Sequence, residues 1–223
     1  MWRILRGSSN VSFLARLGCS AAILLSVMVA RAPGEGIAEA QVTLPPIPDP
    51  VAVTLDPSHT ALLMLDFFVP LCDTLAGCQD SLPPMATLLG QARDAGALVI
   101  FTMPGRPGVS IEPAVAPRPD EMLIAKPQLE TGFDLMQDTL QAHGIDTLIV
   151  TGVSAPLAMY TTWEATGAGY TVVVLTDGIP GTAIAQAITE YQSLNQPVDN
   201  NPDNIPLKPN AATLSRADLV SFR

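Results

Sequence analysis

The chain has 223 residues, a formal net charge of −10 at pH 7 and an apolar fraction of 48%. Such an acidic surface repels the phosphates of nucleic acids and gives no attraction to anionic lipid. Composition therefore excludes nucleic acid as an expected partner, and the length suits a single α/β domain.

The first forty residues have the pattern of a secretory signal peptide. Arginines precede an apolar run over residues 17–30, and an Ala-x-Ala site ends at Ala40. The run is shorter than the roughly 20 apolar residues that span a bilayer. We therefore predict that residues 1–40 direct export to the periplasm or the medium and are then removed, which leaves no stable membrane anchor. The alternative is an uncleaved signal anchor.

The folded domain is predicted to cover residues 58–223. Residues 41–57 are rich in proline and are interpreted as an extended arm or a linker. Residues 60–65 are wholly apolar, which predicts a buried strand, and Asp66 stands at its carboxyl end.

Two cysteines, Cys72 and Cys78, follow in a turn-rich segment. In an oxidising compartment a disulfide between them is plausible, and a pair of free thiols is the alternative. Neither cysteine is expected at a helix start, so neither is an obvious nucleophile.

A helix is predicted over residues 81–95, with Ser81 as its cap and Gly96 as its stop. The next strand is predicted over residues 97–103. The proline-rich residues 104–120 are predicted to form an irregular crossover loop.

A short strand is predicted over residues 121–125, and Lys126 closes it. An amphipathic helix should follow over residues 131–143. Its apolar stripe consists of Phe133, Met136 and Leu140.

The central stretch contains two β-branched apolar runs, residues 147–150 and 171–175. Runs of this kind are typical of parallel strands covered on both faces. Between them, Ser154 and Pro156 indicate a helix start, and Gly167 indicates its end. In parallel sheets, ligands bind where such a helix begins, beyond the carboxyl ends of the strands.

A last helix is predicted over residues 182–194, a loop over residues 196–210, and a terminal strand or helical turn over residues 211–222. The alternation of strands and helices predicts a three-layer α-β-α sandwich around a mostly parallel sheet, similar to a Rossmann fold.

The central stretch resembles the isochorismatase-like superfamily, whose members are often called cysteine hydrolases. The matching residues are an apolar strand followed by Gly152-Val153, then Gly169-Tyr170, and a strand ending at Asp177. The resemblance implies the same α/β fold and a hydrolase of a small molecule.

The resemblance also implies catalytic roles for three positions. Asp66 corresponds to the catalytic acid or base and Lys126 to its cationic partner. Where the family carries its nucleophilic cysteine, this chain has Ala158.

Further features implied by the resemblance are an oxyanion hole at the helix start and a cis peptide between Val153 and Ser154, with Leu157 in the same turn. Some members also bind a metal through histidines. This chain has only His59 and His143, so we expect no such metal site and no cofactor.

Two interpretations remain open. The chain is either a hydrolase that needs no thiol, with Asp66 as general acid and Lys126 as its electrostatic partner, or an inactive pseudoenzyme that retains the fold to bind a ligand. True isochorismatases resemble the first case, because they protonate a vinyl ether and carry a small residue in place of cysteine. Both interpretations imply a small-molecule substrate or ligand and leave a homo-oligomer open.

Overall fold

The computed structural model describes residues 47–127, 130–180 and 201–223. The predicted signal peptide and the predicted helix over residues 182–194 lie outside these ranges. Among the helices that are described, none is long and apolar enough to cross a membrane.

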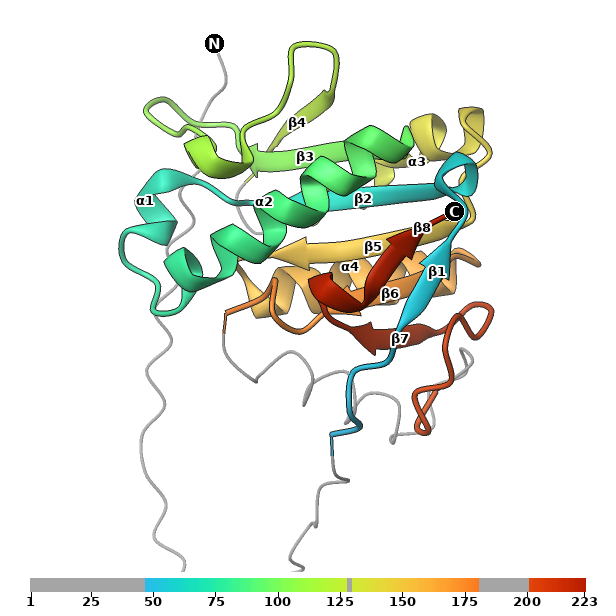
Figure 1. Cartoon of the computed structure of the whole chain (residues 1–223). Helices are drawn as coiled ribbons and strands as arrows, with labels where there is room; N and C mark the ends of the chain where they lie inside the picture. Colours follow the sequence, from blue (N-terminus) through green and yellow to red (C-terminus); the bar gives the residue numbers. More distant parts are fainter. Residues whose placement is uncertain (1–46, 128–129, 181–200) are drawn as a thin grey trace, which may run out of the picture. The chain divides into compact units, whose positions relative to one another are not determined.

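A six-stranded parallel sheet forms the centre of the domain, in the order β4-β3-β2-β5-β6-β7 (Figure 1). This sheet confirms the predicted α/β fold class. Its strands are β2 (Thr60–Leu65), β3 (Leu98–Pro104), β4 (Met122–Lys126), β5 (Thr147–Gly152), β6 (Thr171–Leu175) and β7 (Ala212–Ser215).

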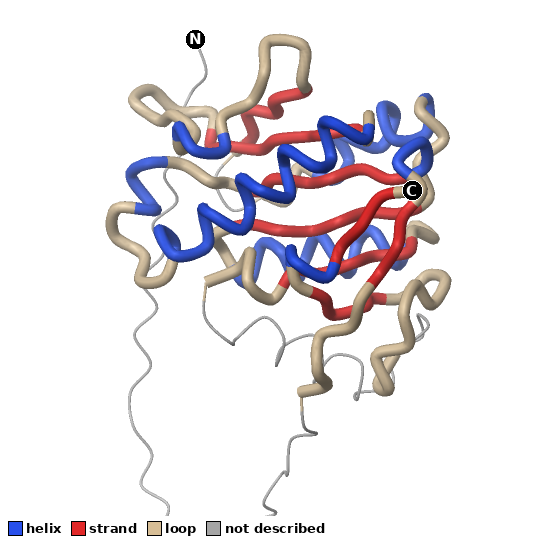
Figure 2. Tube along the Cα trace, in the orientation of Figure 1, coloured by secondary structure: helices blue, strands red, loops and turns tan. Residues whose placement is uncertain are grey.

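Helices cover both faces of the sheet. Helix α2 (Cys78–Ala95) lies on one face, and α3 (Phe133–Ala142) and α4 (Ala155–Gly167) lie on the other (Figures 1 and 2). Shorter elements are α1 (Val69–Cys72) and the 3-10 helices η1 (Pro57–His59), η2 (Pro113–Val115) and η3 (Ala217–Leu219).

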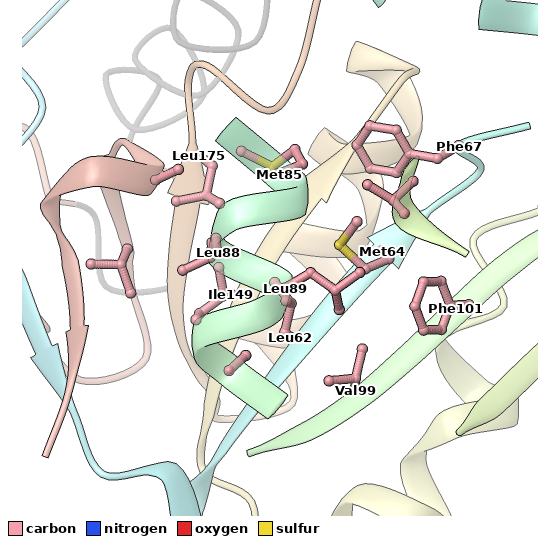
Figure 3. Packing of buried hydrophobic residues seen from close by; sticks show 14 of the residues in the cluster. Leu62, Met64, Phe67, Met85, Leu88, Leu89, Val99, Phe101, Ile149 and Leu175 are labelled. Atoms are coloured by element: carbon pink, nitrogen blue, oxygen red, sulfur yellow. The ribbon is translucent and has the colours of Figure 1, made fainter. Parts of the chain in front are cut away.

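Strand β2 is buried along its whole length because it lies between the two helical layers. Its side chains alternate between the faces, as the pleat of a strand requires. Leu62 and Met64 pack against α2 together with Phe101 and Ile149 (Figure 3). Leu63 belongs to the core on the opposite side, with α3 and α4. A wholly apolar strand is therefore what this position needs.

Helix α2 begins earlier than predicted. It starts at Cys78, after Gly77 in a left-handed conformation, and includes the position expected to be its cap. The hydroxyl of Ser81 instead donates a hydrogen bond back to the Cys78 carbonyl. Its end is as predicted, since Gly96 terminates the helix with φ of 79°.

The structure joins Cys72, the last residue of α1, to Cys78 through a disulfide, with their Cα atoms 5.0 Å apart. Both side chains are buried. The expectation that neither cysteine lies at a helix start is wrong for Cys78, because α2 begins three residues before the predicted start at Ser81.

Part of the predicted proline-rich arm is a strand. Residues Val53–Leu55 form β1, which pairs in parallel with β8 (Val220–Phe222) near the other end of the chain. Val53 and Leu55 are buried and Thr54 is exposed. This apolar–polar–apolar alternation is a strand signal that the surrounding prolines hid. The predicted terminal segment accordingly contains two strands, β7 and β8, separated by η3.

Candidate active site

Asp66 and Lys126 meet at the carboxyl edge of the sheet. The Nζ atom of Lys126 lies 2.9 Å from Oδ2 of Asp66. Lys126 is 1% exposed and Asp66 is 7% exposed. An ion pair held in so little water is a strong local dipole, and removing either partner would leave a buried charge without compensation.

The strand registers explain this meeting. Leu65 of β2 is level with Thr102 of β3, and Pro104 of β3 is level with Lys126 of β4. Asp66 leaves the sheet with φ of 57°, in the left-handed region that aspartate tolerates better than most residues. Its backbone N–H still donates to the Thr102 carbonyl.

Thr102, which no sequence pattern singled out, has a buried hydroxyl that donates a hydrogen bond of 2.7 Å to Oδ1 of Asp66. Threonine is common in strands, and one threonine in an apolar run carries no distinct functional signal. The carboxylate of Asp66 therefore accepts one hydrogen bond on each oxygen.

Beyond β5 the chain turns into α4 next to Asp66. A Cβ added to Gly152 would lie 2.6 Å from the carbonyl oxygen of Leu65, so only glycine permits this approach. The following residue, Val153, donates its N–H to the same carbonyl. The expectation of a cis peptide between Val153 and Ser154 is wrong, because no peptide bond in the described ranges is cis. A trans bond is the ordinary choice, since cis costs about 3–4 kcal/mol without proline.

The first turn of α4 presents free backbone donors to the same edge. Ser154 is the residue before the helix, and its side chain does not cap it. Within the described residues, the N–H groups of Ser154 and Leu157 have no hydrogen-bond acceptor. Pro156 has no N–H, and the N–H of Ala158 donates to the Ser154 carbonyl. Of the predicted oxyanion residues, Ser154 and Leu157 could therefore donate to a ligand, whereas Val153 is already engaged.

Ala158 lies one turn into α4, with its side chain fully buried in the core cluster beneath α3 and α4. It does not line the cleft. The structure thus brings Asp66, Lys126 and the start of α4 to one edge, whereas Ala158 is buried in the core and does not line the cleft.

A cleft of about 530 Å³ opens over this pair. Its polar lining includes Asp66, Lys126, Arg106 and Ser154. The rest is mainly apolar and comes from α1, the end of β3 and α4: Phe68, Pro70, Leu71, Pro104, Pro156, Leu157 and Tyr160. A small ligand with an apolar body and one polar or anionic group fits this lining.

A second cleft, of about 720 Å³, lies at the amino ends of β3 and β4. Two of its charged side chains are matched to each other, because Arg93 donates two hydrogen bonds of 2.7 Å to Glu121. Although burial opposes ionisation of Glu121, these bonds hold its pKa below the usual value. His143 also lies there. With Arg93 and Glu121 paired to each other and neither fully buried, this cleft offers less for chemistry than the cleft at Asp66.

Two other predicted positions have structural partners. Asp177 accepts hydrogen bonds from the Ala217 N–H, which fixes the start of η3. His59 bonds the Gly144 carbonyl at the amino edge of the sheet. Across the described parts of the chain, no group of three or more His, Cys, Asp or Glu residues could hold a metal ion.

Comparison with known proteins agrees with this architecture. The family model for the isochorismatase domain matches residues 60–198. No protein of curated function matches the chain significantly by sequence.

Solved structures show the same fold at low sequence identity. An isochorismatase from Pseudomonas putida is 20% identical with a TM-score of 0.59, over 75% of this chain and 93% of that one. A cysteine hydrolase from Pseudomonas syringae pv. phaseolicola is 18% identical with a TM-score of 0.57, over 76% and 94% of the two chains. A ribonuclease from Caenorhabditis elegans is 16% identical with a TM-score of 0.58, over 74% and 81%. These three proteins share one fold but are named for different activities, so the similarity to them shows the fold alone.

Proposed function

Because the chain belongs to the isochorismatase family, we propose that it is a hydrolase of a small molecule whose chemistry does not use a thiol. Asp66 serves as the general acid or base, and Lys126 is its electrostatic partner. The observation that carries this proposal is the buried Asp66–Lys126 pair at the floor of a cleft of about 530 Å³.

The chemistry that suits this arrangement is acid-assisted cleavage of a carbon–oxygen bond, such as that of an enol ether. Asp66 in its protonated form donates its proton to the terminal carbon of the enol ether double bond, which leaves the oxygen-bearing carbon as a cation. The carboxylate that remains is stabilised at once by Lys126, 2.9 Å away. Water adds to the cationic carbon and gives up one proton to the Asp66 carboxylate, which restores the acid. The resulting hemiketal then collapses to the alcohol and a carbonyl product. The free N–H groups of Ser154 and Leu157 can stabilise negative charge on a ligand oxygen.

A panel of small enol ethers and amides tests the proposal. We expect the wild-type protein to hydrolyse an enol ether, and Asp66→Asn to lower kcat by about 100-fold or more, the usual contribution of general acid–base catalysis. Asp138→Asn is the matched control, since Asp138 is exposed on α3. Equal turnover by wild type and Asp66→Asn would contradict the role of Asp66.

A second candidate is a ligand-binding protein without turnover. It is supported by Ala158 at the position of the family nucleophile and by the Ala158 N–H, which is used within α4. Under this alternative, members of the same panel raise the melting temperature of the protein but are recovered unchanged. Turnover that depends on Asp66 would rule it out.

Export is part of the proposal, supported by the basic and apolar pattern of residues 1–40 and by the joined cysteines Cys72 and Cys78. Expression of the full chain followed by intact-mass measurement is the test. We expect a soluble exported product that lacks the first forty residues. A full-length mass in the membrane fraction would favour the uncleaved anchor instead.

A further inference from the structure

Thr102 has a side chain with a single described partner. It lies near the carboxyl end of β3 and is fully buried. A buried hydroxyl needs a hydrogen-bond partner. Among the described residues this one bonds only the Oδ1 atom of Asp66, at 2.7 Å.

Thr102 and Lys126 bond different oxygens of the Asp66 carboxylate. The hydroxyl of Thr102 occupies Oδ1, and the ammonium of Lys126 occupies Oδ2 at 2.9 Å. Rotation of the carboxylate plane would break both bonds. Since the two donors come from β3 and β4, neighbouring strands of one sheet, the frame that holds the carboxylate is rigid.

The two donors differ in what they allow. An ammonium group only donates hydrogen bonds, whereas a hydroxyl can donate or accept. Thr102 can therefore stay bonded to Oδ1 whether or not that oxygen carries a proton, whereas Lys126 can bond only an oxygen that offers it a lone pair. After the proton leaves, both partners again donate to a carboxylate.

We propose that Thr102 is a positioning residue that fixes the Asp66 carboxylate so that Oδ2 stays on Lys126 and the remaining lone pairs face the cleft. Its consequence for catalysis rests on the proposed function. The geometric statement is independent of it and is tested without any substrate.

The test uses an unusual property of the composition: Lys126 and Lys208 are the only lysines in the chain. Protein labelled with ¹⁵N-lysine should therefore give two side-chain ammonium signals, and Lys208→Arg assigns them. The hydrogen exchange rate of the Lys126 ammonium reports how firmly Asp66 holds it, because Lys126 is buried and bonded to Asp66.

Thr102→Val keeps the shape of the side chain and removes the hydroxyl. We expect hydrogen exchange at Lys126 to become roughly tenfold faster, the factor that corresponds to the loss of one hydrogen bond to a charged group. Thr102→Ser restores the hydroxyl and should restore slow exchange. An unchanged rate in Thr102→Val would overturn the proposal.

Thr151→Val is the matched control for a general loss of stability. Thr151 of β5 is also a fully buried strand threonine, but its hydroxyl donates to the Gly178 carbonyl and not to Asp66. This variant should leave the exchange rate of Lys126 near that of wild type. If Thr151→Val accelerates exchange as much as Thr102→Val does, the faster exchange reflects a general loss of stability, and the proposal is overturned. Failure to find any hydrolysed substrate would leave all of these results standing.

Discussion

Gly132 lies directly against the side chain of Lys126: a Cβ added to Gly132 would come within 3.1 Å of Lys126 Cδ. Gly132 is the residue before α3, with φ of 73°. Gly132 therefore packs on the aliphatic stem of the lysine, and a methyl group at this position would need the stem to move by a few tenths of an ångström.

Gly132→Ala should consequently disturb the ion pair. The new methyl group pushes the Lys126 stem, and the left-handed backbone adds a cost of roughly 1–2 kcal/mol. Gly144→Ala is a close control, because Gly144 has φ of 66° but nothing within 4 Å of its Cβ position. We expect both variants to lower the melting temperature, and only Gly132→Ala to shift the Lys126 ammonium signal. A shift in neither variant would show that the stem has room to adjust.

Ala158→Cys tests whether the site retains the electrostatics of a cysteine hydrolase. The family resemblance implies that the start of α4 and Lys126 would favour a thiolate at this position, whereas burial opposes it. If the charges dominate, the thiol should react with iodoacetamide well below its ordinary pKa of about 8.5. Lys126→Gln should then suppress the reaction, while Lys208→Gln should not.

An installed thiol that titrates like a free one, with no response to Lys126→Gln, would show that these electrostatics are absent. Because Ala158 is fully buried, the larger side chain can also overpack the core by about 1–3 kcal/mol. The melting temperature of the variant should therefore be measured first.

The Cys72–Cys78 bridge should stabilise the wall of the cleft. It joins α1, whose Pro70 and Leu71 line the cleft, to the well-packed start of α2. Chain-entropy arithmetic for so small a loop gives roughly 2 kcal/mol. We expect the double variant Cys72→Ser/Cys78→Ser to lose about this much free energy of unfolding in urea.

Titration of denatured, unreduced wild-type protein should find neither of these thiols free. Hydrogen exchange in residues 69–78 should accelerate in the double variant while the central sheet remains protected. Two free thiols per mature wild-type chain would refute the bridge.

His59 should make stability depend on pH. Its hydrogen bond to the Gly144 carbonyl raises the pKa of the imidazole above the ordinary value of 6.5, with further help from Asp146 and Asp56. A raised folded-state pKa means that the stabilisation is complete below 6.5 and is lost as the pH rises through the folded-state value.

The comparison of wild type with His59→Gln checks this sign. The difference in melting temperature should be greatest near pH 5.5 and should shrink above pH 7.5. His143→Gln serves as the histidine control. A difference that grows with pH would contradict the assignment.

The central features of the site could be predicted because charged residues end apolar strands. Asp66 and Lys126 each interrupt a hydrophobic run at the point where a parallel strand leaves the sheet, and Ser154 with Pro156 marks the start of α4. At these residues, the place in the predicted fold and the chemistry of the side chain both indicate a functional site. The central sheet followed from the same runs.

What could not be predicted depends on contacts between distant segments. Thr102 resembles any strand threonine until Asp66 is placed beside it. Ser81 has the composition of a helix cap, but its hydroxyl bonds backwards to Cys78 and the helix starts earlier. Val53–Leu55 show a short strand pattern among prolines, and their partner β8 lies far away in the sequence. Local preference cannot reveal partners of this kind.

The pairing of β1 with β8 also bears on how the domain is made. Thr54 bonds Ser221, a partner 167 positions later in the sequence. While the chain is being synthesised, β1 has no partner until Val220–Phe222 of β8 have been made. Contacts of such long range form slowly, so a partly made chain carries an open strand that a chaperone or a neighbouring nascent chain could bind. Pairing of β8 with β1 ends this exposure.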